Sequence, residues 1–316
     1  MGATVMADPV TAGLRPAENA IATHGLTKDY GALRALSGLD LQVPTGAIFG
    51  FLGPNGSGKT TTIRVLLDLI RPTAGRATVL GLDCQRDSLA VRQRVGYLPG
   101  ELRLYDNLTG NDHVRLVSRL RPRPPDPAYL RYLTQSLDID LARSTGTYSA
   151  GNKQKLGLLL AMMGDPEVLL LDEPSGGLDP LVQQTVRRLL EERAAAGRTV
   201  FFSSHNLAEV QQLCSIVGIL RAGRLVAVEA VDTLRRRAYR VVEATFARPV
   251  SADDFHLEGV RAVRLDTQQA RFEVDRDAVD RLVKAIARHP VADLSIHEPS
   301  LEDLFLRYYE AAEVAP

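Results

Sequence analysis

The chain has 316 residues, 45% of them hydrophobic, and its 38 Lys and Arg balance 38 Asp and Glu to give a formal net charge of zero at pH 7. This length suits one large domain and a smaller one, and the neutral balance argues against a strongly basic surface, so we expect no nucleic-acid partner. The two cysteines, Cys84 and Cys214, are far apart and lack metal-ligand spacing, which argues against a zinc site or a disulfide framework and suits a reducing cytoplasm.

No apolar run approaches the roughly 18 residues needed to cross a bilayer. The N-terminus has no charged flank followed by an apolar core, so we expect no signal peptide. The expectation is a soluble chain that can still dock to a membrane protein. Residues 1–18 mix Ala, Gly, Pro and Thr without periodicity, which predicts a disordered tail.

The pattern changes after residue 19. Leu39, Leu41 and Val43 alternate with polar residues, which predicts a half-exposed strand. Tyr30 precedes this strand in a turn. An aromatic side chain there either stacks on a nucleotide base or is an ordinary exposed residue, and its position alone leaves both interpretations open.

A glycine-rich stretch follows and fits the phosphate-loop pattern G-x-x-x-x-G-K-[ST]. It reads Gly53-Pro54-Asn55-Gly56-Ser57-Gly58-Lys59-Thr60 and leads into Thr61. The apolar run 47–52 predicts a buried parallel strand before it, and the apolar residues at helical spacing over 61–70 predict a helix that stops at Pro72. Because strand, loop and helix occur in the required order, we expect a nucleotide site rather than an exposed turn.

The chemistry of such a loop follows from its residue types. Glycines let successive backbone N–H groups point at phosphate oxygens, and the N-terminus of the following helix adds its positive dipole end. Lys59 is expected to reach the β- and γ-phosphates, and Thr60 to offer its hydroxyl to Mg²⁺.

A helical insertion is expected after the first half of this α/β core. Residues 91–98 lead into Pro99-Gly100-Glu101 as a strand running into a turn, and residues from about 102 to 163 then predict helices at 111–120 and 129–137. Ser149, in Ser149-Ala150-Gly151-Asn152, precedes a further apolar helix. It is either a helix N-cap or part of an anion site, and composition does not separate the two.

Two carboxylates follow directly after an apolar strand. Residues 168–171 are Val-Leu-Leu-Leu, and Asp172 and Glu173 come next, at a strand end that should lie beside the phosphate loop. We expect Asp172 to hold Mg²⁺ directly or through water, and Glu173 to orient or deprotonate the attacking water. A helix-capping pair on a surface loop is disfavoured because the strand is wholly apolar. His205 follows the next strand, 199–202, where its imidazole is expected to contact the γ-phosphate.

A hairpin over 216–228 is expected to close the first domain near residue 230. The remainder predicts a smaller domain, with Arg235-Arg236-Arg237 as a solvated linker. Its predicted elements are strands at 239–246, 260–265, 271–274 and 293–297 and helices at 277–287 and 301–309. The last helix begins with the capping box Ser300 and Asp303 and carries an apolar face.

Taken together and in this order, the motifs between residues 20 and 230 resemble the nucleotide-binding subunit of ABC transporters. The matches are Gly53–Thr60 with Walker A, 168–173 with Walker B and its catalytic glutamate, Ser149–Asn152 with the signature loop, Leu178-Asp179 with the D-loop, His205 with the switch histidine and Tyr30 with the base-stacking aromatic.

The resemblance implies an α/β fold with a P-loop NTPase core of ABC ATPase type, an antiparallel β subdomain and a helical insertion, plus a small C-terminal α+β domain. The expected boundaries are a tail at 1–18, a nucleotide-binding domain at 19–230 with its helical subdomain at about 102–163, and an accessory domain at 231–316. The implied cofactors are ATP and Mg²⁺, and the implied activity is ATP hydrolysis with Lys59, Glu173 and His205 in catalytic roles.

In this family two subunits bind two ATP molecules head to tail. Carried over, Ser149 and Gly151 would contact the γ-phosphate of the nucleotide held by the partner, and Asp179 would couple the two sites. We therefore expect a second ATPase subunit as a partner, most simply a second copy of this chain.

The finer pattern resembles half-transporter ATPases of bacterial antibiotic and multidrug exporters. It consists of Leu-Pro-Gly-Glu at 98–101, Tyr-Ser-Ala-Gly-Asn-Lys-Gln-Lys at 148–155 and Glu-Pro-Ser-Leu-Glu-Asp-Leu-Phe at 298–305. In those systems the multi-spanning permease is a separate polypeptide, which implies work at the cytoplasmic face of the cell membrane. Docking is expected between residues 100 and 120, where Tyr105 and Leu108 would line a groove.

Two departures from the family stand out. Ala150 and Asn152 replace the commoner Gly and Gln of the signature, and Gly100 stands where the family usually has a Gln that reaches Mg²⁺. Either Glu101 or a water would then complete the metal site. The alternatives to a transporter subunit are a non-transport ABC ATPase that acts as a nucleotide-dependent switch and a regulatory module with weak hydrolysis. A single P-loop without sustained heptads argues against the ribosomal and chromosomal forms.

Overall fold

The computed structural model describes residues 19–236 and 239–297. The chain divides into two compact units, residues 1–228 and 229–316. The predicted N-terminal tail and the predicted helix at 301–309 lie outside the described residues. Within 19–236 and 239–297, no helix has both the length and the apolar composition to cross a membrane.

The first unit is built on a six-stranded sheet in the order β10-β9-β3-β8-β7-β6. These strands are β10 (Arg224–Ala230), β9 (Ile216–Arg221), β3 (Ile48–Leu52), β8 (Thr199–Ser204), β7 (Val168–Asp172) and β6 (Val95–Leu98). From β9 to β6 the neighbouring strands run parallel, so their carboxyl ends meet at one edge. Strands β3, β7 and β8 are buried along their whole length, as the apolar runs predict.

A second, antiparallel sheet in the order β2-β1-β4-β5 carries the alternating segment found in the sequence. Its strands are β1 (Asn19–Tyr30), β2 (Leu33–Pro44), β4 (Ala74–Val79) and β5 (Leu82–Asp83). Leu39, Leu41 and Val43 are at most 1% exposed, whereas the polar residues between them face solvent. The predicted half-exposed strand is therefore confirmed.

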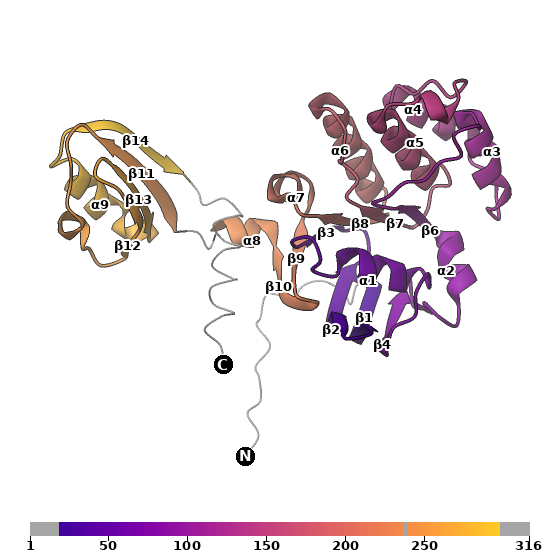
Figure 1. The fold of residues 1–316 in the computed structure, drawn as a ribbon, viewed down its shortest axis with the longest axis horizontal. Helices are drawn as coiled ribbons and strands as arrows, with labels where there is room; N and C mark the ends of the chain where they lie inside the picture. The colour runs from indigo at the N-terminus through magenta and orange to yellow at the C-terminus, as the bar shows by residue number, and fades with distance from the viewer. Residues whose placement is uncertain (1–18, 237–238, 298–316) are drawn as a thin grey trace, which may run out of the picture. The chain divides into compact units, whose positions relative to one another are not determined.

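Helices cover both faces of the central sheet. They are α1 (Lys59–Leu66), α2 (Ser88–Arg94), α3 (Gly110–Arg119), α4 (Pro127–Ser136), α5 (Ala150–Met162), α6 (Pro180–Ala195) and α7 (Leu207–Leu213). Figure 1 shows α3 to α6 on one side of the sheet, and α1 with the antiparallel sheet on the other. This places α1 between two sheets, with Ile63 and Leu66 wholly buried.

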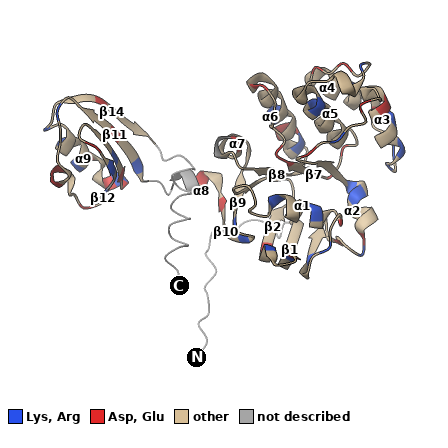
Figure 2. Ribbon diagram, viewed as in Figure 1, with Lys and Arg blue, Asp and Glu red and all other residues tan. Residues whose placement is uncertain are grey.

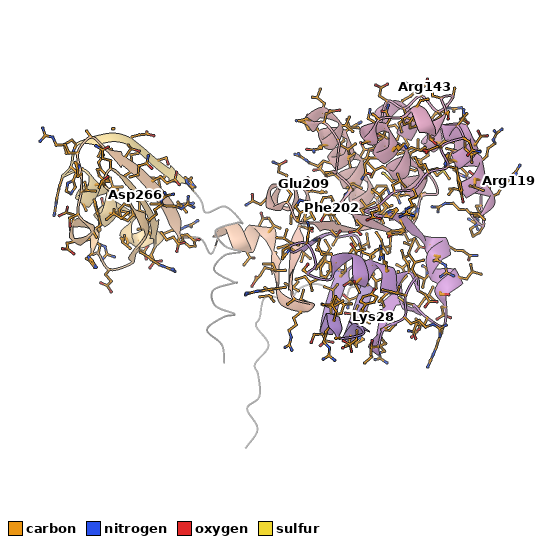
Figure 3. The ribbon with its side chains drawn as sticks, in the orientation of Figure 1. Lys28, Arg119, Arg143, Phe202, Glu209 and Asp266 are labelled. Carbon is orange, nitrogen blue, oxygen red and sulfur yellow. The ribbon has the colours of Figure 1, made fainter. Side chains whose placement is uncertain are left out.

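The core of the first unit joins the two sheets through α1. The rings of Phe49 and Phe201 stack with centroids 5.8 Å apart, and Phe51 lies 5.1 Å from Phe201. Phe202, the next residue along β8 and labelled in Figure 3, is also buried, with 2% of its surface exposed. Truncating one of these rings to Ala would cost about 3–5 kcal/mol, because a cavity is added to the lost transfer free energy.

Both cysteines belong to this packed interior. Cys84 is 1% exposed and Cys214 is 7% exposed. Burial raises the pKa of the Cys84 thiol to about 12 and also raises that of the Cys214 thiol. The two thiols are therefore protonated packing groups at neutral pH.

The second unit contains a four-stranded antiparallel sheet in the order β12-β13-β11-β14, with α9 packed on it. Its elements are α8 (Val231–Arg236), β11 (Arg240–Phe246), β12 (Val260–Leu265), β13 (Gln269–Val274), α9 (Val279–Ile286) and β14 (Val291–His297). Phe246, Phe255, Phe272 and Leu282 form its core. In the described part of both units, acidic and basic residues are interspersed along the elements (Figure 2), in keeping with zero net charge.

Some boundaries differ from prediction. The helix after the phosphate loop spans 59–66 rather than 61–70, and Asp68 then adopts a left-handed φ of 51°. The stretch 91–94 ends α2 and is not strand, because β6 begins only at Val95. Arg235 and Arg236, predicted as part of a solvated linker, are the last two residues of α8.

Candidate nucleotide-binding site

The phosphate loop, residues 53–60, connects β3 to α1 and is shaped by its glycines. A Cβ on Gly53 would lie 2.4 Å from the Leu220 carbonyl oxygen and 2.5 Å from Ser57 Oγ. Gly58 has φ of +110°, where a Cβ would lie 2.7 Å from the Ala35 carbonyl oxygen. Side chains are excluded at both positions, so the backbone can close tightly.

Lys59 lies inside this loop. Its Nζ donates to the carbonyl oxygens of Gly53 at 2.7 Å and Pro54 at 3.3 Å, and the residue is 6% exposed. Nζ also lies 3.5 Å from Glu173 Oε1. A cation is thus held where phosphate oxygens would gather.

The start of α1 differs from those of α3 to α6. No side chain caps it and its first turn has no acidic residue, whereas Thr109, Asp126, Ser149 and Asp179 cap α3, α4, α5 and α6. The free N–H groups of the first turn, which includes Thr61, are therefore available to an anion. Ser57 Oγ is buried in the loop without a hydrogen-bond partner among the described residues.

Asp172 ends β7 and faces the phosphate loop. It is 1% exposed, and its Oδ2 accepts a hydrogen bond from Thr60 Oγ1 at 2.7 Å. Its Oδ1 accepts one from Ser203 Oγ at 2.5 Å. Thr60 and Asp172, which the sequence predicts as metal ligands, are therefore side by side.

Glu173 and His205 meet at the neighbouring strand ends. His205 Nδ1 lies 2.8 Å from Glu173 Oε2, a hydrogen bond in which the proton is on Nδ1. The His205 side chain is 61% exposed and that of Glu173 29%. Glu173 has a left-handed φ of 51°, and such strained non-glycine backbone recurs at functional sites.

Gly100 lies next to Asp172, whereas Glu101 faces solvent. A Cβ on Gly100 would lie 3.2 Å from Asp172 Oδ2. The Glu101 side chain is 86% exposed and lies 3.9 Å from Arg103. The position at which the family usually has a glutamine therefore borders Asp172, and the Glu101 side chain faces solvent.

Tyr30 lies at the end of β1 and is 43% exposed. Lys28 Nζ lies 5.0 Å from the centroid of its ring, a cation–π distance. The ring is accessible, as a base-stacking role requires, and the geometry does not distinguish this role from that of an ordinary surface tyrosine.

The signature residues lie at the start of α5. Ser149 is exposed, and its Oγ accepts from the Asn152 N–H at 3.2 Å, so the N-cap interpretation is confirmed. Gly151 is half-buried, with a Cβ position 3.1 Å from the Gly177 carbonyl oxygen. Asp179 is exposed and caps α6 by accepting from Leu181 and Val182 at 3.0 Å.

Two further residues hold the acidic end of β7, and neither was singled out from the sequence. Ser203 donates to Asp172 as described above, and Gln154 Nε2 of α5 donates to the Pro174 carbonyl oxygen at 2.9 Å. Both contacts join segments remote in sequence, so no local pattern marks them. The hydroxyl-rich end Ser203-Ser204-His205 was the available signal.

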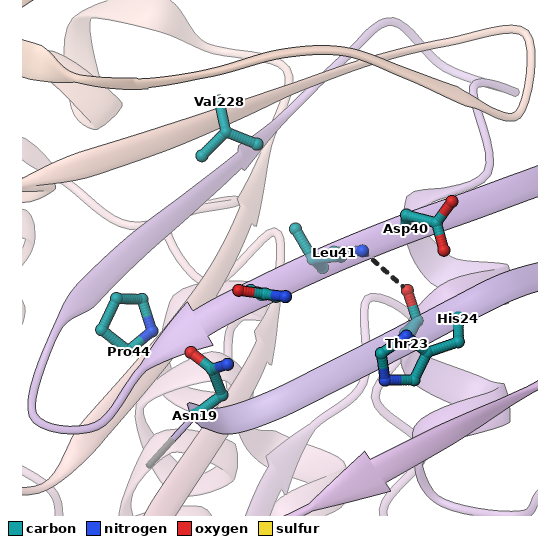
Figure 4. A pocket seen from close by; sticks show the side chains of 8 residues that line it. Asn19, Thr23, His24, Asp40, Leu41, Pro44 and Val228 are labelled. Atoms are coloured by element: carbon teal, nitrogen blue, oxygen red, sulfur yellow. Dashed lines mark hydrogen bonds between the residues drawn. The ribbon is translucent and has the colours of Figure 1, made fainter. Parts of the chain in front are cut away.

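Two hollows lie elsewhere in the first unit. One, of about 550 Å³, is bordered by Thr23, His24, Asp40 and Val228 (Figure 4), and the Leu41 N–H donates to Thr23 Oγ1 at 3.0 Å. It contains none of the predicted site residues. The other, here called the apolar groove, has about 460 Å³ and is lined by Leu67, Leu69, Arg92, Val95, Tyr97, Leu102, Val117, Leu120, Arg121, Gly157, Leu160 and Ala161.

The residues present fit ATP. The loop combines free first-turn amides, a buried lysine and the unpartnered hydroxyl of Ser57, which are the donors that phosphate oxygens need. They also fit Mg²⁺, which characteristically takes one or two carboxylates and completes its shell with phosphates and water. Among the described residues no cluster of three His, Cys, Asp or Glu side chains offers a fuller cage.

Comparison with known proteins agrees with this geometry. Residues 36–176 match the ABC transporter family, and residues 238–297 match the C-terminal domain of EvrA-like ABC transporters. The daunorubicin resistance ATP-binding protein DrrA3 of Streptomyces coeruleorubidus is 34% identical over 92% of this chain and 96% of its own length. The bacitracin transport ATP-binding protein BcrA of Bacillus licheniformis is 32% identical over 91% of this chain and 96% of its own.

Solved structures give the same fold. The ATP-binding subunit of an ABC transporter superposes with a TM-score of 0.64 at 28% identity, covering 69% of this chain and 92% of that one. The dimeric bacterial cassette MJ0796 superposes with a TM-score of 0.61 at 20% identity, covering 67% and 98%. The predicted α/β P-loop fold of ABC type is confirmed, and this chain belongs to the ABC transporter family as one of its ATP-binding, ATP-hydrolysing subunits.

Proposed function

We propose that this chain powers the export of a drug- or antibiotic-like compound through a separate membrane permease, working at the cytoplasmic face of the membrane. The observation that carries the proposal is the meeting of Lys59, Asp172, Glu173 and His205 at one edge of the sheet, in a chain whose full-length relatives are named for daunorubicin resistance and bacitracin transport. None of the relatives described above has a name connected with ribosomes or chromosomes.

The hydrolytic step follows from the contacts of Glu173. With Oε2 held by His205 and Oε1 near Lys59, its carboxylate is placed to orient or deprotonate a water that attacks the γ-phosphorus of ATP. The bond to the β-phosphate oxygen then breaks and ADP leaves. Lys59 binds the phosphates, and His205 contacts the γ-phosphate.

The metal ligands in this proposal are Thr60 and Asp172. Bound Mg²⁺ would neutralise charge on the β- and γ-phosphate oxygens. Asp172 is suited to this role because burial and two hydrogen bonds fix its carboxylate beside the Thr60 hydroxyl.

The complete site needs two copies of the chain in this proposal. Ser149 and Gly151 are accessible at the start of α5, where they would contact the γ-phosphate bound by a partner copy, and Asp179 would couple the sites. The dimeric state named for MJ0796 supports this arrangement by analogy. The expected boundaries, 19–230 for the ATPase domain and 231–316 for the accessory domain, belong to the same proposal.

The permease would dock on the apolar groove. Leu102, Val117 and Leu120 come from the stretch expected to bind it, whereas Tyr105 and Leu108 do not line the groove. Arg121 adds a chemical requirement. Its guanidinium has no hydrogen-bond or ion-pair partner among the described residues, and burial lowers its pKa. A half-buried cation without a partner is costly, so we expect a permease segment that is apolar and carries a carboxylate.

A direct test of docking compares two exposed leucines. Leu120→Ser, at the groove, should reduce co-purification of the permease by at least about tenfold, because central apolar contacts supply most interface free energy. Leu33→Ser on β2 is the matched control, since Leu33 is 68% exposed and Leu120 77%. Equal recovery with both variants would move the docking site elsewhere, and a loss with Tyr105→Ala alone would restore the first expectation.

The function itself is tested by affinity purification of the Glu173→Gln chain from membranes with Mg-ATP. The variant should retain phosphate binding and block the hydrolytic step, so it should hold the assembled complex. Recovery of a multi-spanning membrane protein in stoichiometric amount is the expected result, and Lys59→Ala is the control that should not be trapped. Recovery of ribosomes or chromatin instead would support the nucleotide-dependent switch.

A further inference from the structure

We infer that Ser203 is a positioning residue for the hydrolytic reaction, because its hydroxyl fixes the Asp172 carboxylate toward the metal site and supports the backbone of Glu173. This inference rests on the proposal that Thr60 and Asp172 hold Mg²⁺. It adds a residue that binds neither nucleotide nor metal itself.

The placement of Ser203 is set by the sheet. Strands β7 and β8 pair in parallel, with Asp172 opposite Ser203 in the register. Ser203 is 0% exposed and Asp172 is 1% exposed, so water does not compete for their hydrogen bond of 2.5 Å. Among side chains of this size, only one with a donor can satisfy the carboxylate at this position.

The hydrogen bond from Ser203 gives the two oxygens of the Asp172 carboxylate different partners. Oδ1 accepts from Ser203, and Oδ2 accepts from Thr60 and borders the Gly100 position. One oxygen is therefore anchored to β8 while the other faces the phosphate loop. Without the Ser203 hydroxyl, Oδ1 would be buried without a donor and the carboxylate could rotate to share the Thr60 hydroxyl.

The same hydroxyl also contacts the next residue. The Glu173 N–H donates to Ser203 Oγ at 3.3 Å and to the Ser203 carbonyl oxygen at 3.1 Å. This bifurcated contact holds Glu173 in its left-handed conformation, which costs an isolated L-residue about 1–2 kcal/mol. Ser203 uses its one hydrogen for Asp172 and one of its two lone pairs for Glu173.

Glycine at position 100 makes the orientation of Asp172 depend more strongly on Ser203. A side chain at position 100 would start 3.2 Å from Asp172 Oδ2, but glycine has none there. Among the described residues, two side chains donate to the Asp172 carboxylate, those of Thr60 and Ser203. Thr60 is itself a proposed metal ligand, so Ser203 is the donor that can orient Asp172 from outside the metal site. Groups that orient a ligand from outside the coordination shell typically change metal affinity by about 10–100-fold when removed.

The test separates this role from ordinary support of a buried acid. In a Glu173→Gln background, the ATP dissociation constant is measured by calorimetry in EDTA and again in saturating Mg²⁺. The ratio of the first constant to the second, here called the coupling ratio, reports how strongly metal and nucleotide binding reinforce each other. Ser203→Ala should reduce this ratio by about tenfold, as expected for loss of an orienting partner. Ser203→Thr, which keeps the donor, should restore it. The Mg²⁺ concentration that half-saturates hydrolysis by the chain with native Glu173 should rise in parallel.

Ser204→Ala is the matched control. Ser204 is also 0% exposed on β8, but its Oγ donates to Glu209 Oε2 at 3.1 Å and makes no hydrogen bond to Asp172 or Glu173. A merely structural role for Ser203 predicts lower melting temperatures for both alanine variants and an unchanged ratio, and that result would overturn the inference. If Ser203→Ala does not fold, Ser203→Cys, with a similar volume and a weaker donor, should give an intermediate ratio.

Different results would overturn the proposed Mg²⁺ site and the positioning role of Ser203. A ratio near one in the Glu173→Gln protein, unchanged by Asp172→Asn, would overturn the metal site and with it the inference. A large ratio that Asp172→Asn abolishes and Ser203→Ala leaves intact would keep the metal site and overturn only the role of Ser203.

Discussion

The starts of α1 and α5 are both candidate phosphate sites, and they are built in opposite ways. At α1 the glycines let the loop close tightly, Lys59 is 6% exposed and no side chain caps the helix. At α5 Ser149 is exposed and its own hydroxyl caps the helix. The first site is therefore preorganised within one chain, whereas at the second the Ser149 hydroxyl is already engaged with the Asn152 N–H.

The largest expected effect lies at the first site. Lys59→Ala should weaken ATP binding to the isolated chain by about 100-fold, since a buried charge-assisted contact typically contributes 1.5–3 kcal/mol. Calorimetric titration measures this directly. Lys284→Ala is the control, because Lys284 is an exposed lysine paired with Asp280 in the second unit. An affinity within threefold of the unmodified chain would remove Lys59 from the phosphate site.

The second site should respond in a different property. Ser149→Ala should leave ATP affinity of the isolated chain unchanged and reduce turnover by at least about tenfold, as for other groups that contact a transferred phosphate. Stability should also fall by about 1 kcal/mol because a helix cap is lost.

Ser149→Asp separates these two losses. An aspartate can cap α5 and so restore stability, but its charge repels phosphate and turnover should stay low. Asp126→Ala removes the cap of α4 and should cost stability alone. Recovery of turnover in Ser149→Asp would mean that Ser149 acts only as a cap.

The smallest expected effect is on stability at low pH. Unlike α1, α3 begins with a capping box, formed by Thr109 and Asp112, and its contribution to stability depends on pH. The Thr109 hydroxyl, then the Thr109 N–H and Arg115, lower the pKa of Asp112 to about 2. Because this pKa lies below the unfolded value of about 3.9, the stabilising contribution is full above that value and is lost as pH falls through about 2. An NMR titration should find the low pKa, and Thr109→Ala should return it toward its ordinary value. An unchanged value in that variant would assign the shift to Arg115.

Local pattern was sufficient for the parts of the site that are contiguous in sequence. The glycine spacing of 53–60 predicts the loop, and an apolar run ending in Asp172 and Glu173 predicts acids at a strand end, since parallel strands finish at one edge. The two segments could be placed together because both follow buried strands. The 3.5 Å approach of Lys59 to Glu173 agrees with that reasoning.

Contacts fixed by strand register or by packing could not be read in the same way. Ser203 meets Asp172 only because β7 lies beside β8 in a particular register, and the apolar groove joins residues from 67 to 161. Helix α2 was missed because its seven residues include a single buried side chain, Val91, so they give no helical period. Helix α6 was likewise not assigned, although Asp179-Pro180 is a good helix start.

The buried thiols described in the core have a practical consequence. The chain has only two cysteines, and packing keeps both protonated and enclosed, so maleimide reagents should react with neither in the folded protein. A single cysteine introduced at an exposed position would then accept a fluorophore or spin label without prior removal of the native ones. The approach of two labelled copies on adding ATP could be followed by distance spectroscopy in an otherwise unaltered chain.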